Sequence, residues 1–422
     1  MENKHTIGDL FQMQSLPLHA KIRMTMARIE GWVDEFGEDG VYISFSGGKD
    51  STVLMDIIRN KMRLDIPAVF VDVPTQYPEL KQFALTWDNV EVLKPKVSFM
   101  DVCEKYGFPL ISKEVSAAVY DGKKYLTRVV EQVASVQTDR QTDRQTDRQI
   151  SGFWAFADVT GIPRRDKAKN GEQYQNLQKG IIPDEVAERL LPREIYEEYK
   201  DKVKPPVRLQ MLYGQYQHKE KGVLTDEYSK RYDKHKYEFM LSAPFDVSDR
   251  CCKVMKKAPL HAYSKETGRK PMTAQMADES ELRRANWIKY GCNGFQMKSP
   301  ISNPMSFWTE QDILTYIHTY NIPICPVYGE VVEDYEAEGI LENQITFEDF
   351  KCDKIYKTTG CKRTGCMLCG FGCHAKDDRR FLLLKESHPK MYNLLDVVKN
   401  NGVTFREAIE WTNEHGNLNI KL

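Results

Sequence analysis

Short apolar runs alternate with helix-periodic stretches in the early part of the chain. Val41–Phe45 is an unbroken run rich in β-forming residues, which favours a buried parallel strand. Apolar side chains then recur at helical spacing at Val53, Leu54, Ile57 and Ile58. This change of period predicts a strand, a sharp turn and a helix that begins at about Asp50 or Ser51.

The same alternation continues downstream. Ala68–Val73 and Val90–Leu93 are predicted to be strands, and the stretch around Leu80–Trp87 between them is predicted to be helical. Strands that alternate with helices form right-handed βαβ units, so we expect an α/β fold with a doubly wound, mostly parallel sheet. Asp72 then stands at the carboxyl end of its strand, where such sheets bind ligands.

An amphipathic helix is predicted before the first strand. Its apolar positions recur every three or four residues at Leu18, Ile22, Met26, Ile29, Val33 and Phe36. We expect this helix to cover the sheet, with a second subunit as the alternative partner for its apolar face.

The turn after the first strand has the chemistry of an anion site. It reads Ser46-Gly47-Gly48-Lys49-Asp50-Ser51. A strand, a glycine turn and a helix N-terminus present unpaired amides, to which the serine hydroxyls add donors and Lys49 adds a point charge. A glycine turn without a ligand is the plainer interpretation. The spacing differs from that of the Walker A motif.

Length and charge set broad limits. The 422 residues allow two or three domains, and the net charge of −1 predicts neither nucleic-acid nor membrane binding in bulk. No apolar run approaches the length of a membrane span, and a cytoplasmic protein is expected. We expect a helical segment over 1–36, an α/β domain over 37–330 interrupted by a charged insertion at 121–240, and a C-terminal metal-binding and helical segment over 331–422.

A short repeat lies inside the expected insertion. Residues 137–149 read QTDR three times and then Gln, without an apolar side chain, so a solvated linker or helix is predicted. The codons CAG-ACA-GAC-AGA encode Gln-Thr-Asp-Arg, so a tetranucleotide CAGA tract would produce this peptide. Replication slippage in such a tract would shift the reading frame. A neutral duplication at the protein level explains the peptide equally well.

The ten cysteines of the chain are clustered, which indicates metal or redox chemistry rather than a disulfide scaffold. Cys361, Cys366, Cys369 and Cys373 are spaced as in a zinc knuckle. The adjacent pair Cys251 and Cys252 favours a [4Fe–4S] cluster, because neighbouring cysteines seldom both ligate one small tetrahedral ion, whereas a cube has spread corners. Zinc stays the alternative.

Several motifs resemble those of a known family. The loop resembles the Ser-Gly-Gly-x-Asp-Ser loop of the PP-loop adenine nucleotide α-hydrolases. The segment Asp72–Glu79 is similar to one in phosphoadenosine phosphosulfate (PAPS) reductases, although it lacks their Thr-Gly pair. Asn303–Ile313, Ile322–Tyr328 and Gly365–Cys369 resemble later motifs of iron–sulfur sulfonucleotide reductases. The chain is identified as PAPS reductase-like, with the insertion outside the matched motifs.

The resemblance assigns residues to roles. It implies that Cys251, Cys252, Cys366 and Cys369 ligate the cluster. Cys361 and Cys373 are then extra thiols, for which a sulfur carrier, a substitute ligand and simple buried thiols are the alternatives. Lys49 and Asp50 are expected to be catalytic, with Cys361 or Cys373 as the thiol. The expected nucleotide-binding residues are Ser46, Gly47, Gly48, Lys49, Asp50, Ser51, Asp72 and Arg283.

Arg283 belongs to a modified motif. Ala274–Arg283 is similar to the family's Gly-x-Arg-x-x-Glu-Ser-x-x-Arg, with Ala274 replacing the glycine and Met276 the first arginine. Arg283 therefore remains the better candidate for an anion contact. It lies in a basic segment, Arg250–Lys298, whose net charge of +7 suits a polyphosphate, a sulfate or nucleic-acid phosphates. A solvated charged face is the plainer interpretation of part of it.

Three functions compete. The favoured one is ATP-dependent sulfur transfer, in which ATP adenylates an acceptor such as a nucleic acid and sulfur displaces AMP. The second is thiol-dependent reduction of adenylyl sulfate or PAPS to sulfite. Assimilatory reductases carry a catalytic cysteine near the C-terminus, and many of them have a modified loop. This chain has an intact loop and no cysteine in Glu414–Leu422, and both departures weigh against assimilatory reduction. The third is a non-catalytic, zinc-containing nucleic-acid-binding protein. The expected partners are an adenine nucleotide, a sulfur donor or thiol reductant, and a second copy of the chain. Mg²⁺ is expected to bind together with the nucleotide.

Overall fold

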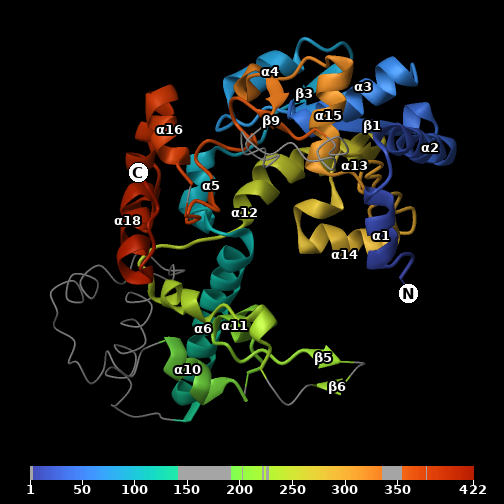
Figure 1. Ribbon diagram of the computed structural model, residues 1–422. Coiled ribbons are helices and arrows are strands. Elements are labelled where there is room, and N and C mark those ends of the chain that lie inside the picture. Colours follow the sequence, from blue (N-terminus) through green and yellow to red (C-terminus); the bar gives the residue numbers. More distant parts are fainter. Residues whose placement is uncertain are drawn as a thin grey trace, which may run out of the picture. The chain divides into compact units, whose positions relative to one another are not determined.

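A computed structural model describes residues 3–140, 192–201, 203–220, 223–224, 228–334, 354–376 and 378–422 (Figure 1). Most of the QTDR repeat, residues 141–149, lies outside these residues. Two compact units are present. Unit 1 comprises Met1–Lys96 and Met255–Cys366, and unit 2 comprises Val97–Val254 and Met367–Leu422. This division follows contacts within the chain, whereas the expected domains followed motifs and composition, and their boundaries stay a prediction.

Unit 1 is built on a parallel four-stranded sheet in the order β3-β2-β1-β7. The strands are β1 (Val41–Phe45), β2 (Ala68–Val71), β3 (Val90–Leu93) and β7 (Lys270–Met272). The helices of the unit are α1 (Ile7–Gln14), α2 (Leu18–Phe36), α3 (Lys49–Asp56), α4 (Pro78–Ala84), α13 (Ala258–Thr267), α14 (Glu281–Tyr290) and α15 (Glu310–Tyr320). A small antiparallel pair, β8 (Val331–Glu333) and β9 (Tyr356–Thr358), completes it. The predicted α/β class and parallel sheet are confirmed.

Both faces of this sheet are covered. Ile43 and Phe70 contribute to a large core that also takes in Ile29 of α2, as the apolar period of the N-terminal helix predicts. Tyr42 and Val69 point to the other face, where they pack with Tyr263 of α13. Alternate residues of a parallel strand thus bury on opposite sides, which explains why the strands read as unbroken apolar runs.

Helix α15 is fixed to the rest of unit 1 by buried polar contacts. Thr309 caps its N-terminus in a capping box with Asp312. The Asp312 carboxylate also accepts hydrogen bonds from the buried Lys21 ammonium at 2.6 and 2.7 Å. Tyr316 donates to Asp56 at 2.5 Å and thereby ties α15 to α3. The start of α15 is therefore held close to the first strand and its loop.

Unit 2 is mainly helical. Its helices are α5 (Phe99–Tyr106), α6 (Lys113–Arg140), α10 (Pro192–Tyr199), α11 (Val207–Leu212), α12 (Arg250–Cys252), α16 (Arg380–Ser387), α17 (Pro389–Tyr392) and α18 (Phe405–Gly416). Its strands form short pairs: β4 (Leu110–Ile111) with β10 (Gly370–Phe371), β5 (Lys219–Glu220) with β6 (Val223–Leu224), and β11 (Lys399–Asn400) with β12 (Val403–Thr404). No helix in the described part of the chain is apolar over the length that a bilayer crossing needs.

A buried lysine organises the centre of unit 2. Lys123 of α6 is 3% exposed, and its ammonium donates to the carbonyl oxygens of Ala243 and Phe245 at 2.8 and 2.7 Å. It also lies 3.3 Å from an oxygen of Asp246, itself buried. Burial lowers the pKa of Lys123, and Asp246 opposes that change. These contacts hold α6 to the extended chain that precedes Cys251.

Candidate functional site

The loop between β1 and α3 takes the conformation that its glycines allow. Gly47 has a φ of +71°, and a Cβ there would lie 2.9 Å from the carbonyl oxygen of Leu80, so a side chain is excluded. Ser46 and Ser51 close the loop through their hydroxyls, which are 3.0 Å apart. Ser51 also donates to the Gly48 carbonyl at 2.9 Å. The predicted strand, glycine turn and helix N-terminus are confirmed, with α3 beginning at Lys49.

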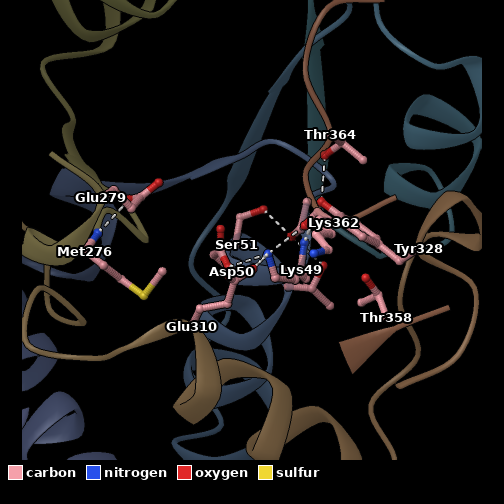
Figure 2. A network of polar contacts seen from close by, with 12 residues as sticks. Lys49, Asp50, Ser51, Met276, Glu279, Glu310, Tyr328, Thr358, Lys362 and Thr364 are labelled. Atoms are coloured by element: carbon pink, nitrogen blue, oxygen red, sulfur yellow. Dashed lines mark hydrogen bonds and ion pairs between the residues drawn. The ribbon is translucent and has the colours of Figure 1, made fainter. Parts of the chain in front are cut away.

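Lys49 is the centre of a polar network in unit 1 (Figure 2). Its side chain is 4% exposed, and its ammonium donates to the carbonyl oxygen of Lys362 at 3.1 Å. Carboxylate oxygens of Glu310 and Asp50 lie 3.1 and 3.7 Å from the same nitrogen. All three partners are oxygen acceptors, which are the kind of atom that a bound phosphate presents.

Tyr328 covers the other side of the loop. Its hydroxyl accepts the Lys49 amide at 3.3 Å and lies 2.6 Å from the hydroxyl of Thr364 (Figure 2). Burial raises the pKa of Tyr328 to about 12, so the phenol stays neutral at physiological pH. A neutral hydroxyl can release the Lys49 amide, so that the amide binds a ligand, and the hydroxyl can then donate its own hydrogen bond to that ligand.

The carboxylate of Asp50 has fewer hydrogen-bond partners than the ammonium of Lys49. Its Oδ1 is buried and accepts no hydrogen bond, although the side chain as a whole is 30% exposed. Burial raises the pKa of Asp50; Lys49 opposes this rise and Glu310 adds to it. Arg363 and Arg283 oppose it further. A buried carboxylate oxygen without a donor suits a cation that arrives with a ligand.

The remaining nucleotide-site candidates lie around this loop. Asp72 follows β2 directly and pairs with Lys81 at 2.7 Å beside a cavity of about 390 Å³, which Tyr77 and Gln76 also line. Arg283, in the first turn of α14, pairs with Glu279 and lines a second cavity of about 220 Å³. Burial lowers the pKa of Arg283, and the charge of Arg363 lowers it further. Both predicted residues therefore border hollows in unit 1.

The expected cluster ligands are divided between the units. Cys366 ends unit 1, whereas Cys251, Cys252 and Cys369 belong to unit 2. None of the nine described cysteines forms a disulfide with another described residue, which thiolate ligation requires. Within the described residues, however, no group of three or more His, Cys, Asp or Glu side chains gathers as a metal site. The [4Fe–4S] cluster and the zinc alternative both stay predictions.

The two extra thiols differ in their surroundings. Cys373 is 1% exposed and its thiol donates to the Gly370 carbonyl at 2.8 Å, while burial raises its pKa to about 12. As placed it is a poor nucleophile, because the thiolate is the reactive form. Cys361 is half-buried in unit 1, with its sulfur 4.0 Å from the Tyr77 hydroxyl and its carbonyl next to Lys362. Cys361 is the more accessible thiol.

Sequence reasoning missed most of the partners of Lys49. Glu310, Tyr328, Lys362 and Thr364 lie far along the chain from the loop, and no periodicity connects them to it. Tyr328 and Glu310 did fall inside motifs that resembled the family's, and their position there was the only available signal.

Comparison with protein families supports this site. The model of the phosphoadenosine phosphosulfate reductase domain matches residues 40–150 and 188–370. The chain belongs to this family. A search of curated proteins found no significant match. The matched range contains the loop and every residue of the Lys49 network, and it extends into the expected insertion on both sides.

Membership in the family implies an enzyme of the adenine nucleotide α-hydrolase type that carries out nucleotide-dependent sulfur chemistry. Substrates of the family are PAPS or adenylyl sulfate. The match covers Cys251, Cys252, Cys366 and Cys369 without assigning a metal to them. It leaves sulfur transfer and reduction equally open.

Proposed function

We propose that the chain binds ATP at the loop Ser46–Ser51, adenylates an acceptor and transfers sulfur to it. The surroundings of Lys49 carry this proposal. Its ammonium is held in a buried position by three oxygen atoms, and the closest carboxylate belongs to Glu310, which is 45% exposed and can turn away. A polyphosphate can replace such a partner, because the Glu310 carboxylate loses little by returning to water.

In the first step, a nucleophilic atom of the acceptor attacks the α-phosphorus and pyrophosphate leaves. Lys49 and the amides of the loop stabilise the negative charge that grows on the α-phosphate oxygens. Tyr328 can donate to the same group once its hydroxyl releases the Lys49 amide. Asp50, whose Oδ1 accepts no hydrogen bond and lies 3.7 Å from the Lys49 ammonium, would hold the Mg²⁺ ion that accompanies ATP.

In the second step, a terminal sulfur carried as a persulfide attacks the acceptor carbon that bears the adenylated oxygen, and AMP leaves with that oxygen. Cys361 would carry that sulfur, and a thiol reductant would then cleave the remaining sulfur–sulfur bond. Cys251, Cys252, Cys366 and Cys369 would hold a [4Fe–4S] cluster, which supplies redox-active iron when bound. The acceptor class that the basic segment around Arg283 favours is a nucleic acid.

Reduction of a sulfonucleotide is the second candidate, and the accessible thiol of Cys361 beside the Lys49 network supports it. Here the Cys361 thiolate attacks the sulfur of adenylyl sulfate or PAPS, and the nucleotide leaves with the bridging oxygen. A second thiol then attacks Cys361, so that sulfite is released and a disulfide forms.

Product analysis separates these candidates. Purified protein is incubated with ATP and a nucleic-acid acceptor plus a persulfide donor, or with adenylyl sulfate or PAPS plus a thiol reductant. Formation of AMP and pyrophosphate with labelled sulfur in the acceptor supports transfer, and release of sulfite supports reduction. Lys49→Met should abolish the nucleotide-dependent product, and Lys123→Met, which removes a buried lysine of unit 2, is the matched control. Unchanged affinity of Lys49→Met for ATP, adenylyl sulfate and PAPS would overturn the assignment of this site.

A further inference from the structure

Arg363 is held beside the loop by both of its neighbours in the sequence. The carbonyl oxygen of Lys362 accepts the Lys49 ammonium at 3.1 Å, and the Thr364 hydroxyl lies 2.6 Å from that of Tyr328 (Figure 2). Thr364 is also close to the glycine turn, since a Cβ on Gly48 would lie 3.5 Å from its hydroxyl oxygen. The backbone of Arg363 is thus fixed at the edge of the loop, while its side chain is exposed.

The segment that carries Arg363 is anchored at its base as well. The amides of Gly360 and Cys361 donate to the carbonyl oxygens of Tyr328 and Val327, each at 2.9 Å. A Cβ on Gly360 would lie 2.6 Å from the Val327 oxygen, so this close approach requires glycine. Residues 360–364 therefore form a built turn over the loop rather than a loosely placed tail.

A second arginine faces the same place from another element. Burial and then the charge of Arg363 lower the pKa of Arg283 of α14, and the charges of both arginines oppose the rise in the pKa of Asp50. Arg283 is paired with Glu279, whereas Arg363 forms no ion pair with a described residue. The charges of both arginines therefore act at Asp50, which follows Lys49 in the loop, and within the described residues no ion pair offsets the charge of Arg363. An anion between them would satisfy both.

The sequence shows that the segment Ala274–Arg283 lacks one of the cations of the motif that it resembles. Met276, 4% exposed, occupies the position of the first arginine in the motif that Ala274–Arg283 resembles. Arg363, whose neighbours Lys362 and Thr364 contact the loop network, brings a cation to the loop from another segment of the chain.

Building on the proposed function, we infer that Arg363, together with Arg283, binds the terminal phosphate of a nucleoside triphosphate. The inner phosphates occupy the amides of Ser46–Ser51 and Lys49, so the third phosphate extends to the edge where residues 360–364 cross. Arginine binds such a group through two parallel hydrogen bonds. Adenylyl sulfate has only two linked anionic groups, a phosphate and a sulfate, where ATP has three phosphates. PAPS has the same two linked groups, and its additional phosphate is on the ribose. Arg363 is therefore a determinant of specificity for triphosphate over sulfonucleotides.

Binding titrations of the full-length protein test this assignment. Affinities for MgATP, ADP, AMP, adenylyl sulfate and PAPS are measured for the wild type, Arg363→Ala, Arg363→Lys and Lys362→Ala. Arg363→Ala should weaken ATP binding by roughly tenfold or more, the scale of a charge-assisted hydrogen bond. The affinities of Arg363→Ala for AMP, adenylyl sulfate and PAPS should stay within about twofold of wild type. The ATP affinity of Arg363→Lys should lie between those of wild type and Arg363→Ala, because lysine keeps the charge but lacks the two parallel donors of the guanidinium.

Lys362→Ala is the matched control. It removes an equal charge one residue away, but only the backbone carbonyl of Lys362 contacts Lys49, so its effect on ATP should stay under about threefold. Equal losses in Lys362→Ala and Arg363→Ala, or a uniform loss across all five nucleotides, would overturn the inference. A loss confined to adenylyl sulfate or PAPS would also overturn it. Failure of the proposed function is a separate outcome, because it would appear as nucleotide affinity that does not depend on Lys49.

Discussion

Lys49 of unit 1 and Lys123 of unit 2 are buried to nearly the same extent, at 4% and 3% exposed, but they have different partners. Lys123 donates to two carbonyl oxygens at 2.8 Å or less and lies beside a buried aspartate. Lys49 has one carbonyl at 3.1 Å and carboxylates at 3.1 and 3.7 Å, the nearer of which belongs to the 45% exposed Glu310. Rigid, short contacts mark a structural cation, whereas replaceable contacts mark a binding one. Burial alone does not distinguish the two roles.

The largest expected effect is on stability. Lys123→Met should lower the free energy of unfolding by about 3–5 kcal/mol, because it leaves Asp246 and two carbonyls buried without their donor. Lys49→Met should cost about 1 kcal/mol or less, since Glu310 can turn to water. Urea denaturation of both variants measures the difference. Lys123→Met combined with Asp246→Asn should recover part of the loss, and equal destabilisation by the two single substitutions would contradict the comparison.

Nucleotide affinity should show the reverse order. Lys49→Met should weaken ATP binding by roughly 1.5–3 kcal/mol, the value of a hydrogen bond to a charged group. Lys123→Met should leave the affinity of the folded protein unchanged, because its partners all lie in unit 2. Calorimetric titration at a temperature where both variants are folded makes the measurement. A loss of affinity in Lys123→Met as large as in Lys49→Met would remove the distinction between them.

Glu310 tests whether a carboxylate partner of Lys49 is replaced by the ligand. If its carboxylate leaves Lys49 when a polyphosphate binds, Glu310→Gln should strengthen ATP binding by up to about 1 kcal/mol, because a competing anion is removed. The matched control is Glu281→Gln on α14, an exposed carboxylate that pairs with Arg284 instead. Weaker ATP binding in Glu310→Gln would show that the carboxylate supports the bound ligand rather than competing with it.

The smallest expected effect is a pH dependence. Because burial raises the pKa of Asp50 above its ordinary 3.8, its contribution to stability is fully present below pH 3.8 and is lost as the pH rises through the raised value. Asp50→Asn does not titrate, so it should be more stable than the wild type at pH 7, and this advantage should disappear as the pH falls below the ordinary value. Thermal unfolding across this range checks it. An advantage that grows on acidification would give the wrong sign.

The sequence predicted the parts of unit 1 that depend on neighbouring residues. Val41–Phe45 and the glycine turn were recognisable because strand period, turn chemistry and helix period follow one another directly. The partners of Lys49 were not, since Glu310 and Lys362 reach the loop only after the sheet and α15 have packed. The same limit applies to Cys251 and Cys366, whose shared role the motif suggests but which fall in different units.

The interleaving of the two units has a consequence for synthesis. Ribosomes make Met1–Lys96 first, yet the edge strand β7 and the residues that contact Lys49 come only after Val97–Val254 has emerged. Unit 2 likewise waits for Met367–Leu422. A nascent chain therefore holds two incomplete cores until Met255–Cys366 is made, and one until its last segment is made, so it relies on chaperones for longer than a chain with consecutive domains. A frameshift in the repeat at 137–149 would remove the second half of both units, so the product would be an unfolded fragment cleared by proteolysis rather than a partly active enzyme.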